Sequence, residues 1–339
     1  MMILLVLSIA VAKTLFSTGF FREIYPGFEG RIVEEIQLPG VEDIAICRAD
    51  SFLILSMDDR AARRDGNAHQ GGLYKIDLRK PIEPVLISGN FDQTLYPHGI
   101  SLLKTDSGQY QLLVINHVQG KHTVEKFALF GDSLVHKESI SDPALISPND
   151  LVAIDENHFY VTNDHKYRSG MNRFFEDYLG LAISNVVYFD NGGFSEVADG
   201  IAYANGINYD VDRNLMFVAS PRGFRVKVYS KQSDGNLEFI EDIRTRTGVD
   251  NIEFDEDGKL WIGCHPNLMK FARYATGKTP ESPSEIITID YRGEDDYEVK
   301  SVFVDDGSIV SASTVAVPFG NLVFIGNVMD ESVVVWEKE

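Results

Sequence analysis

The sequence lacks the features of several common enzyme classes. It contains no G-x-S-x-G motif, no Ser, His and Asp spacing that predicts a catalytic triad, and no glycine-rich phosphate loop. The only cysteines are Cys47 and Cys264, and no C-x-x-C spacing indicates a zinc or redox site. The two thiols could form one disulfide, but they are not a disulfide framework. The sequence therefore contains no motif that predicts a serine hydrolase or a nucleotide-phosphate-binding enzyme.

Basic residues are scarce relative to acidic ones. The 31 Lys and Arg against 51 Asp and Glu leave a formal net charge of −20. Because such a surface repels phosphate backbones, we expect no nucleic-acid partner. The charge suits bound cations and neutral or cationic small molecules, and most of the excess acid serves solubility.

Long apolar runs are confined to the N-terminus. Met1–Ala12 is apolar and precedes Lys13, and its length fits a signal peptide better than a membrane span. Ala10 and Ala12 give the small-x-small cleavage pattern, although no basic residue precedes the run. We expect residues 1–25 to be a signal peptide or a membrane anchor, and the protein to be secreted, periplasmic or anchored on the extracytoplasmic side. A buried N-terminal helix is the alternative.

Helical periodicity is scarce after residue 30, where short β-branched, aliphatic and aromatic runs are bounded by Gly, Asp, Asn and Pro. Many short strands with frequent turns are typical of a sandwich, a barrel or a propeller. The predicted strands include Phe52–Leu55, Leu112–Ile115, Phe159–Thr162, Leu215–Ala219, Val226–Tyr229, Leu260–Gly263 and Leu322–Gly326.

A repeat distinguishes these folds. Similar units begin at Val41, Pro97, Pro148, Ala204 and Val249, each with polar residues, an aliphatic residue, a strand, a turn and a second strand. Their spacing of about 45–56 residues is typical of propeller blades. A sixth, degenerate unit fits Val302–Glu339. We therefore predict an all-β fold, a six-bladed β-propeller over residues 26–339, preceded by a hydrophobic N-terminal helix.

Two segments interrupt the repeat. Ser169–Leu181 has helical spacing and predicts a short helix that caps one propeller face, where it either packs on the blades or lines a pocket. The apolar residues of this helix are Phe174, Phe175, Tyr178, Leu179 and Leu181. The polar segment Asp58–Gln70 predicts a mobile loop within the first blade.

Polar pairs recur where the first strand of each unit begins. First strands line the central channel of a propeller, so equivalent positions converge on the axis. The pairs are Glu42-Asp43, His98-Gly99, Asn149-Asp150, Asn205-Gly206 and Asp250-Asn251. Any one pair could merely satisfy turn or channel hydrogen bonds with water, but the set in register favours a bound metal.

Calcium is the metal that this set of side chains predicts. Calcium takes six to eight oxygen ligands in irregular geometry, whereas zinc prefers the nitrogen and sulfur ligands that are not grouped here. Two carboxylates balance the charge of the ion, and three amides add ligands. We expect the ligands of this ion to be Glu42, Asn149, Asn205, Asp250 and Asn251. A second calcium deeper in the channel would be held by Asp43, Asp150 and the backbone carbonyl of Ile100.

Histidines supply candidate bases near neutral pH. His98 lies at the repeat position of the second unit, and His117 ends the following strand. We expect His98 to deprotonate water and His117 to orient it or relay the proton, although either histidine could be structural. A carboxylate ligand, Glu42 or Asp250, remains the alternative base or nucleophile. His165 and His265 follow strand ends and are candidates for supporting roles around the metal.

These residues resemble the paraoxonase/arylesterase family. The matching strings, in order, are VEDIAI at Val41, PHGISL at Pro97, VINH at Val114, SPNDLVAI at Ser147, FYVTNDH at Phe159, YLGLA at Tyr178, ANGIN at Ala204, VDNI at Val249 and LWIGCHPN at Leu260. The resemblance implies a propeller with two axial calcium ions and a histidine dyad at His98 and His117. It also implies that Asp164 and His165 lie outside the calcium ligands.

The implied activity is lactone hydrolysis, with promiscuous hydrolysis of aryl esters and organophosphates. The N-terminus and Phe174–Leu181 resemble membrane- or lipoprotein-associating helices of the family, so a lipid surface is an expected partner. Vertebrate members join their termini by a disulfide, which the C-terminal ESVVVWEKE cannot supply, so ring closure must rest on strand pairing. Asp58–Gln70 and Ser220–Phe224 also depart from the vertebrate pattern, so substrate preference does not carry over.

Two rival functions remain at this point. One is a different hydrolase on the same fold, acting on sugar lactones as gluconolactonases do or on phosphotriesters. The other is a non-catalytic, calcium-stabilised propeller that binds a protein or lipid. Calcium-dependent turnover of a lactone distinguishes the enzymes from the binding module.

Overall fold

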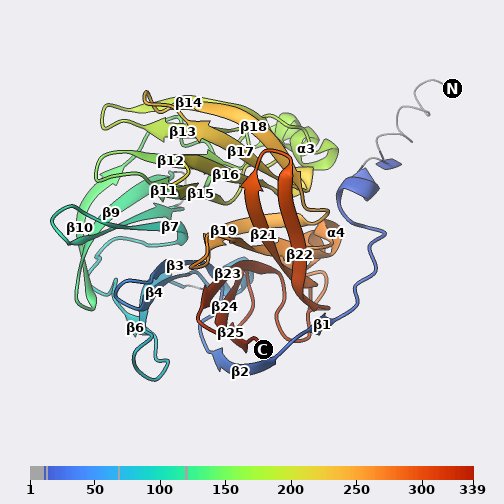
Figure 1. Cartoon of the computed structure of the whole chain (residues 1–339), viewed down its shortest axis with the longest axis horizontal. Coiled ribbons are helices and arrows are strands. Elements are labelled where there is room, and N and C mark those ends of the chain that lie inside the picture. Colours follow the sequence, from blue (N-terminus) through green and yellow to red (C-terminus); the bar gives the residue numbers. More distant parts are fainter. Residues whose placement is uncertain (1–10, 13, 68, 119–120) are drawn as a thin grey trace.

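The structure is a computed structural model that describes residues 11–12, 14–67, 69–118 and 121–339 (Figure 1). Its strands form six antiparallel sheets around a central axis. The first strands of neighbouring sheets contact one another in an unbroken ring, in the order β3, β7, β11, β15, β19 and β23. The six-bladed β-propeller predicted from the repeat is therefore confirmed.

Four blades are built from strands that follow one another along the chain. The first contains β3 (Val41–Cys47), β4 (Phe52–Met57), β5 (Gly72–Asp77) and β6 (Val85–Leu86). The second contains β7 (Pro97–Lys104), β8 (Tyr110–Asn116), β9 (Thr123–Phe130) and β10 (Ser133–Ile140). The third contains β11 (Pro148–Ala153), β12 (Phe159–Asn163), β13 (Ser184–Phe189) and β14 (Phe194–Ile201). The fourth contains β15 (Ile207–Asp210), β16 (Leu215–Ser220), β17 (Arg225–Lys231) and β18 (Leu237–Arg244).

The last two blades recruit strands from the N-terminal part of the chain. The fifth contains β19 (Gly248–Phe254), β20 (Leu260–His265), β21 (Ser284–Gly293), β22 (Asp296–Asp305) and β1 (Gly27–Phe28). The sixth contains β23 (Ser313–Phe319), β24 (Leu322–Asn327), β25 (Val333–Glu337) and β2 (Arg31–Ile36). The sixth unit thus begins later than predicted, because Val302 belongs to β22 of the fifth blade.

Pairing of β2 with β25 closes the ring. Arg31 lies opposite Glu337 and forms an ion pair of 2.8 Å with it, and Ile36 lies opposite Val333. The C-terminus accordingly lies beside β25 and β2 (Figure 1). Cys47 and Cys264 are both free and buried. Ring closure therefore rests on strand pairing, as expected from the sequence.

The second strand of each blade is sandwiched between neighbouring blades. Every residue of β4 is buried, and Leu53 and Leu55 pack in one cluster with Phe324 of the sixth blade. A strand covered on both faces needs apolar side chains at every position, so it appears as a continuous hydrophobic run in the sequence. All the strands predicted individually lie inside observed strands. Each of them is a second strand except Val226–Tyr229, which lies in the third strand β17 and alternates apolar and polar residues.

Short helices gather on one face of the ring. The predicted capping helix is confirmed as α3 (Gly170–Leu179), which ends at Gly180 in a left-handed conformation with φ 57°. α4 (Leu268–Ala275) and the 3₁₀ turn η1 (Pro221–Gly223) were not expected. The polar segment predicted as a mobile loop in the first blade contains a further helix, α2 (Arg60–Arg64).

The N-terminal segment joins two of these helices. Residues 14–17 are helical, and the Thr14 hydroxyl donates to the carbonyl of Tyr178 in α3 at 2.9 Å. The N–H of Leu268 in α4 donates to the carbonyl of Thr18 at 2.9 Å. Met1–Ala10 and Lys13, which carry most of the predicted signal or anchor run, lie outside the described residues. In the part of the chain that is described, no helix has the length and apolarity needed to cross a membrane.

Candidate active site

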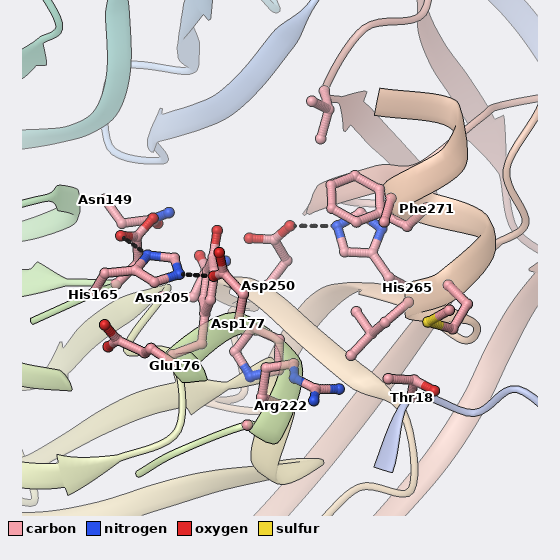
Figure 2. Close-up of a pocket in the computed structure, with 18 of the residues that line it drawn as sticks. Thr18, Asn149, His165, Glu176, Asp177, Asn205, Arg222, Asp250, His265 and Phe271 are labelled. Atoms are coloured by element: carbon pink, nitrogen blue, oxygen red, sulfur yellow. Dashed lines mark hydrogen bonds and ion pairs between the residues drawn. The ribbon is translucent and has the colours of Figure 1, made fainter. Parts of the chain in front are cut away.

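A cavity of about 560 Å³ opens at one end of the central axis. Four predicted metal ligands line it: Glu42, Asn149, Asn205 and Asp250. Glu42 comes from β3, Asn149 from β11 and Asp250 from β19, while Asn205 lies two residues before β15. The ring of inner strands therefore brings together residues more than 200 positions apart in the sequence. Figure 2 shows Asn149, Asn205 and Asp250 directed towards the same space.

Irregular strand pairing points these polar pairs at the axis. The pairing of the first with the second strand shifts register between Val41 and Asp43, and again between Pro148 and Leu151. Equivalent shifts occur in the second, fifth and sixth blades. A bulge of this kind redirects side chains that a regular ladder would send to opposite faces. In each of these blades the residues at the start of the first strand therefore do not follow the regular strand pairing, and their side chains can turn towards the axis.

Glycine at the partner positions lets the inner strands come close. A Cβ on Gly99 would lie 2.6 Å from the Cα of Asp150, and one on Gly206 would lie 2.4 Å from the carbonyl oxygen of Asp250. Neither distance is compatible with a side chain. The PHG and ANG motifs are therefore needed for the axial residues of adjacent blades to converge.

All five predicted ligands of the first ion end in a buried oxygen that lacks a hydrogen-bond partner among the described residues. The atoms are Glu42 Oε2, Asn149 Oδ1, Asn205 Oδ1, Asp250 Oδ1 and Asn251 Oδ1. Asn251 does not line the cavity, but its Nδ2 donates to the carbonyl of Glu42 at 2.9 Å. Burying polar atoms without partners is costly, and a cation bound among these oxygens would offset that cost. Carboxylate and amide oxygens are the donors that calcium prefers.

Acidic and histidine side chains alone do not make this site. Among the residues that the structure describes, no three His, Cys, Asp or Glu side chains lie close enough to hold a metal. The candidate centre therefore depends on its three amide oxygens as well as its two carboxylates. This composition argues against zinc, which would require nitrogen or sulfur ligands.

A second cavity of about 320 Å³ contains Asp43, Ile100 and Asp150, the residues predicted for the second ion. The Asp43 carboxylate accepts a 2.8 Å bond from the N–H of Ile100, and that of Asp150 accepts one from Ile207. Each acid thus ties its blade to the next. Burial, and then the charge of Glu42, raises the pKa of Asp43 to about 8. Burial and the charge of Asp43 raise the pKa of Asp150 well above its ordinary value. A cation in this cavity would oppose these effects.

Three histidines form a hydrogen-bonded chain that starts in the first cavity. His98 Nε2 lies 3.3 Å from Glu42 Oε1, and His98 Nδ1 lies 2.7 Å from His117 Nε2. His117 Nδ1 then lies 2.8 Å from His122 Nδ1. Burial, and then the nearby His98, lowers the pKa of His117 well below its ordinary value. A neutral His117 is suited to accept a proton from one neighbour and pass one to the other.

Two further histidines are held by carboxylates (Figure 2). His165 lies between Asp164 at 2.5 Å and Asp177 at 2.7 Å. Burial alone would lower the pKa of His165, but these two acids outweigh burial and raise the pKa to about 9. His265 Nε2 lies 2.8 Å from Asp250 Oδ2, and the ring of His265 stacks on Phe271. These contacts fix one carboxylate oxygen of Asp250 and leave the other free.

The helices wall the cavity above the metal candidates. Tyr178 of α3, Phe271 of α4 and Thr18 all contribute to the lining. Phe174, Phe175 and Tyr178 are also exposed, with 50%, 43% and 58% of their surfaces accessible, and Leu179 is 37% accessible. The capping helix therefore both lines the pocket and presents an aromatic face to solvent.

Sequence reasoning missed two residues, one in the histidine chain and one in the cavity wall. His122 was overlooked, although Asn116 pairs with Thr123 across the β8–β9 hairpin, so residues 117 and 122 oppose each other just beyond the ladder. The Gly at position 120 signals this turn in the sequence. Arg222 of η1 also lines the cavity, and no repeat or motif identified it.

Comparison with known proteins agrees with the fold and identifies the family. The Arylesterase family model matches residues 22–335. Serum paraoxonase/arylesterase 1 of Homo sapiens is 33% identical, covering 95% of this chain and 98% of the human protein. Serum paraoxonase/arylesterase 2 of Rattus norvegicus is 32% identical over 87% of this chain and 88% of its own length. The solved luciferin-regenerating enzyme shares the fold, with a TM-score of 0.60 and 12% identity over 93% of this chain and 96% of that protein.

Proposed function

Because this chain belongs to the arylesterase family, we propose that it is a calcium-dependent hydrolase of lactones that also cleaves aryl esters and organophosphates promiscuously. The observation that carries the proposal is the set of five buried oxygens without partners, contributed by Glu42, Asn149, Asn205, Asp250 and Asn251. These residues would hold the catalytic ion. Calcium, when bound, supplies positive charge that stabilises negative charge developing on the carbonyl oxygen of the ester.

The histidine chain supplies the base. When His98 Nε2 is unprotonated, His98 Nδ1–H donates to His117 Nε2 and His117 Nδ1–H donates to His122. A water in the cavity gives its proton to His98 Nε2 as its oxygen attacks the carbonyl carbon. The chain shares this proton as far as half-buried His122. When the ester C–O bond breaks, the chain returns the proton through His98 Nε2 to the leaving alkoxide oxygen, which leaves Nε2 unprotonated again.

The amide and carboxylate groups orient the reactants. Asn149 lines the cavity and can donate its Nδ2–H to the carbonyl oxygen of the substrate. His265 holds Asp250, and Asn251 holds Glu42, so both carboxylates keep a fixed orientation. Glu42 lies against His98, so it remains the alternative base or nucleophile.

The test is calcium-dependent turnover of a lactone. The purified full chain should hydrolyse a lipophilic γ- or δ-lactone, lose that activity in EDTA and regain it when calcium rather than magnesium is added back. Calcium should also raise the melting temperature, because a ligand that binds only the folded state stabilises it. Undiminished turnover in EDTA would contradict the proposed metal dependence.

Assays of the same purified protein also test the two alternative functions. A gluconolactonase-like or phosphotriester hydrolase would turn over sugar lactones or phosphotriesters faster than lipophilic lactones. A calcium-stabilised binding module would show the rise in melting temperature without turnover of any ester. The charge-relay geometry of His98 and His117 favours the hydrolase, since a binding module has no use for it.

Three further proposals concern the second cavity, the two parts of the chain and the exposed face of α3. Asp43, Asp150 and Ile100 would hold a second, structural calcium in the second cavity. Residues 26–339 form the hydrolase domain, and residues 1–25 act as a signal peptide or membrane anchor that places it outside the cytoplasm. The exposed face of α3 would rest on a membrane or lipid surface through Phe174, Phe175 and Tyr178.

A further inference from the structure

Arg222 is a charged cavity residue that the mechanism proposed above does not use. It lies in η1, between β16 and β17, and its side chain lines the cavity beside Asp177 (Figure 2). Its Nη1 donates to the carbonyl of Ser17 at 3.4 Å. Its Nε and Nη2 are buried, and neither has a hydrogen-bond partner among the described residues.

These two nitrogens form one edge of the guanidinium plane. Nε–H and Nη2–H point the same way, and this fork matches the two oxygens of a carboxylate. A buried donor without a partner is costly, and more so when it is charged. Burial lowers the pKa of Arg222, because removing the charged guanidinium from water disfavours its protonated form. The edge is thus preorganised for an anion that the protein itself does not supply.

Nearby acids are already engaged. Asp177, which acts electrostatically on Arg222, is bonded to His165 at 2.7 Å and to Arg173 at 3.2 Å. Among the described residues, Arg222 has no ion pair, whereas Arg60 on the same cavity wall lies 3.8 Å from the carboxylate of Asp58. Arg222 is therefore a cavity arginine with buried donors and no ion pair, whereas Arg273, which also lines the cavity without an ion pair among the described residues, is exposed to solvent.

Packing holds the guanidinium in place. A Cβ on Gly180, at the end of α3, would lie 2.8 Å from Arg222 Nη2, so the group fits against the backbone of that helix terminus. The carbonyl of Ser17 fixes the opposite edge. The N-terminal segment, α3 and η1 thus hold the free edge at the cavity wall.

We propose that Arg222 binds a carboxylate carried by the substrate, so that the preferred substrates are lactones with an acidic side chain. This inference rests on the proposed lactonase function for its substrate class. A chain with a net charge of −20 repels anions in general, and so a dedicated cation inside the cavity is needed to select one. The lactone ring would lie at the axial oxygens and the carboxylate at Arg222.

The direct test compares γ-butyrolactones that carry a carboxyalkyl chain with the same lactones ending in a carboxamide, over one to six methylene groups. At the tether length that spans the cavity, the carboxylate should have a kcat/KM about 10-fold or more above that of its carboxamide, mainly through KM. Arg222→Met should bring the ratio close to one. Arg222→Lys, which keeps the charge without the fork, should give an intermediate ratio. The control Arg225→Met, whose arginine pairs with Asp242 instead, should keep the wild-type ratio.

A binding measurement separates this inference from the function on which it rests. The corresponding γ-lactams are not esters, so calorimetry with them reports on Arg222 whether or not the protein hydrolyses lactones. Tighter binding of the carboxylate lactam to wild type than to Arg222→Met supports the inference. Equal binding of the carboxylate and carboxamide lactams at every tether length overturns it. If Arg222→Met does not fold, the comparison of wild type with Arg222→Lys decides in the same way.

Discussion

At the scale of single residues, His98 occupies the junction between the metal candidates and the proton path. One ring nitrogen lies against Glu42 and the other against His117. A ring between a carboxylate and a second imidazole can exist in either tautomer, and each tautomer implies a different direction of proton movement. The base therefore belongs to the whole chain of three histidines rather than to one ring.

Replacement of His98 tests this assignment. His98→Gln should lower kcat/KM for a lactone by about 10²-fold or more, because the glutamine amide cannot accept the proton of water. Bound calcium, measured by atomic emission, should be unchanged. His158→Gln is the matched control, since His158 is paired with Asp155 on an exposed turn. Full lactonase activity in His98→Gln would remove this residue from the mechanism.

His165 gives the fold a dependence on pH. Asp164, Asp177, Arg173 and Tyr203 surround its ring, and its pKa rises from 6.5 to about 9. Stability from a raised pKa is complete below pH 6.5 and is lost as the pH rises through about 9. The shift in the pKa of His165 contributes at most about 3 kcal/mol to the free energy of unfolding. Urea unfolding at pH 6.5 and pH 9.5 should therefore show a larger loss in wild type than in His165→Gln. Equal losses would mean that the ring is not charged in the fold.

The sequence predicted the axial residues because they occupy a repeated position. Glu42, Asn149 and Asp250 begin equivalent inner strands, and a ring of such strands has only one axis on which they can meet. His122 and Arg222 could not be found this way, since they lie in connections between strands. Such connections vary from blade to blade, so each position has no equivalent with which to compare it.

At the scale of elements, the inner strands depend on glycine for their spacing. A Cβ on Gly99 would meet the backbone of Asp150 in the next blade, which cannot move without shifting β11. Gly99→Ala should therefore lower the free energy of unfolding by about 2 kcal/mol or more, as overpacked cores do. Gly27→Ala is the control, because no atom lies within 4 Å of the added group. Urea denaturation measures both variants, and equal stability would show that the blades can separate freely.

The sequence predicted the second strands of the blades, but it did not predict the short elements β6 and α4 or the pairing of β2. The second strands were evident because burial on both faces makes them continuously apolar. β6 has only two residues, too few for any pattern. α4 has only eight residues, about two turns, so its apolar spacing extends over too short a stretch to predict a helix. β2 pairs with a strand that is about 300 residues away, and no local signal identifies such a partner.

At the scale of the whole molecule, the two ends of the propeller are joined only by non-covalent pairing. Arg31→Cys with Glu337→Cys would add a disulfide where the two side chains already touch. The bond closes nearly the whole chain into a loop, so we expect a stabilisation of about 2–4 kcal/mol and a rise in melting temperature of about 3–6 °C. The buried Cys47 and Cys264 should not compete.

The same double variant in dithiothreitol is the internal control, and each single cysteine variant checks for intermolecular bonds. Mass spectrometry must first establish that the disulfide has formed. An oxidised protein that melts at the same temperature as its reduced form would show that the ring does not open at this blade when it unfolds.

The sixth blade contains strands from both the N-terminal and the C-terminal parts of the chain. This arrangement determines when the ring can close during folding. β2 is synthesised before the first inner strand, β3, whereas its partner β25 is synthesised after the last inner strand, β23. Until β25 has been synthesised, β2 has no edge to pair with, and this pairing cannot close the ring. The oxygens of Glu42 and Asp250 are therefore held around one axis only after strands from both parts of the chain have joined in the sixth blade. A metal ion at the axis would accordingly bind late in folding.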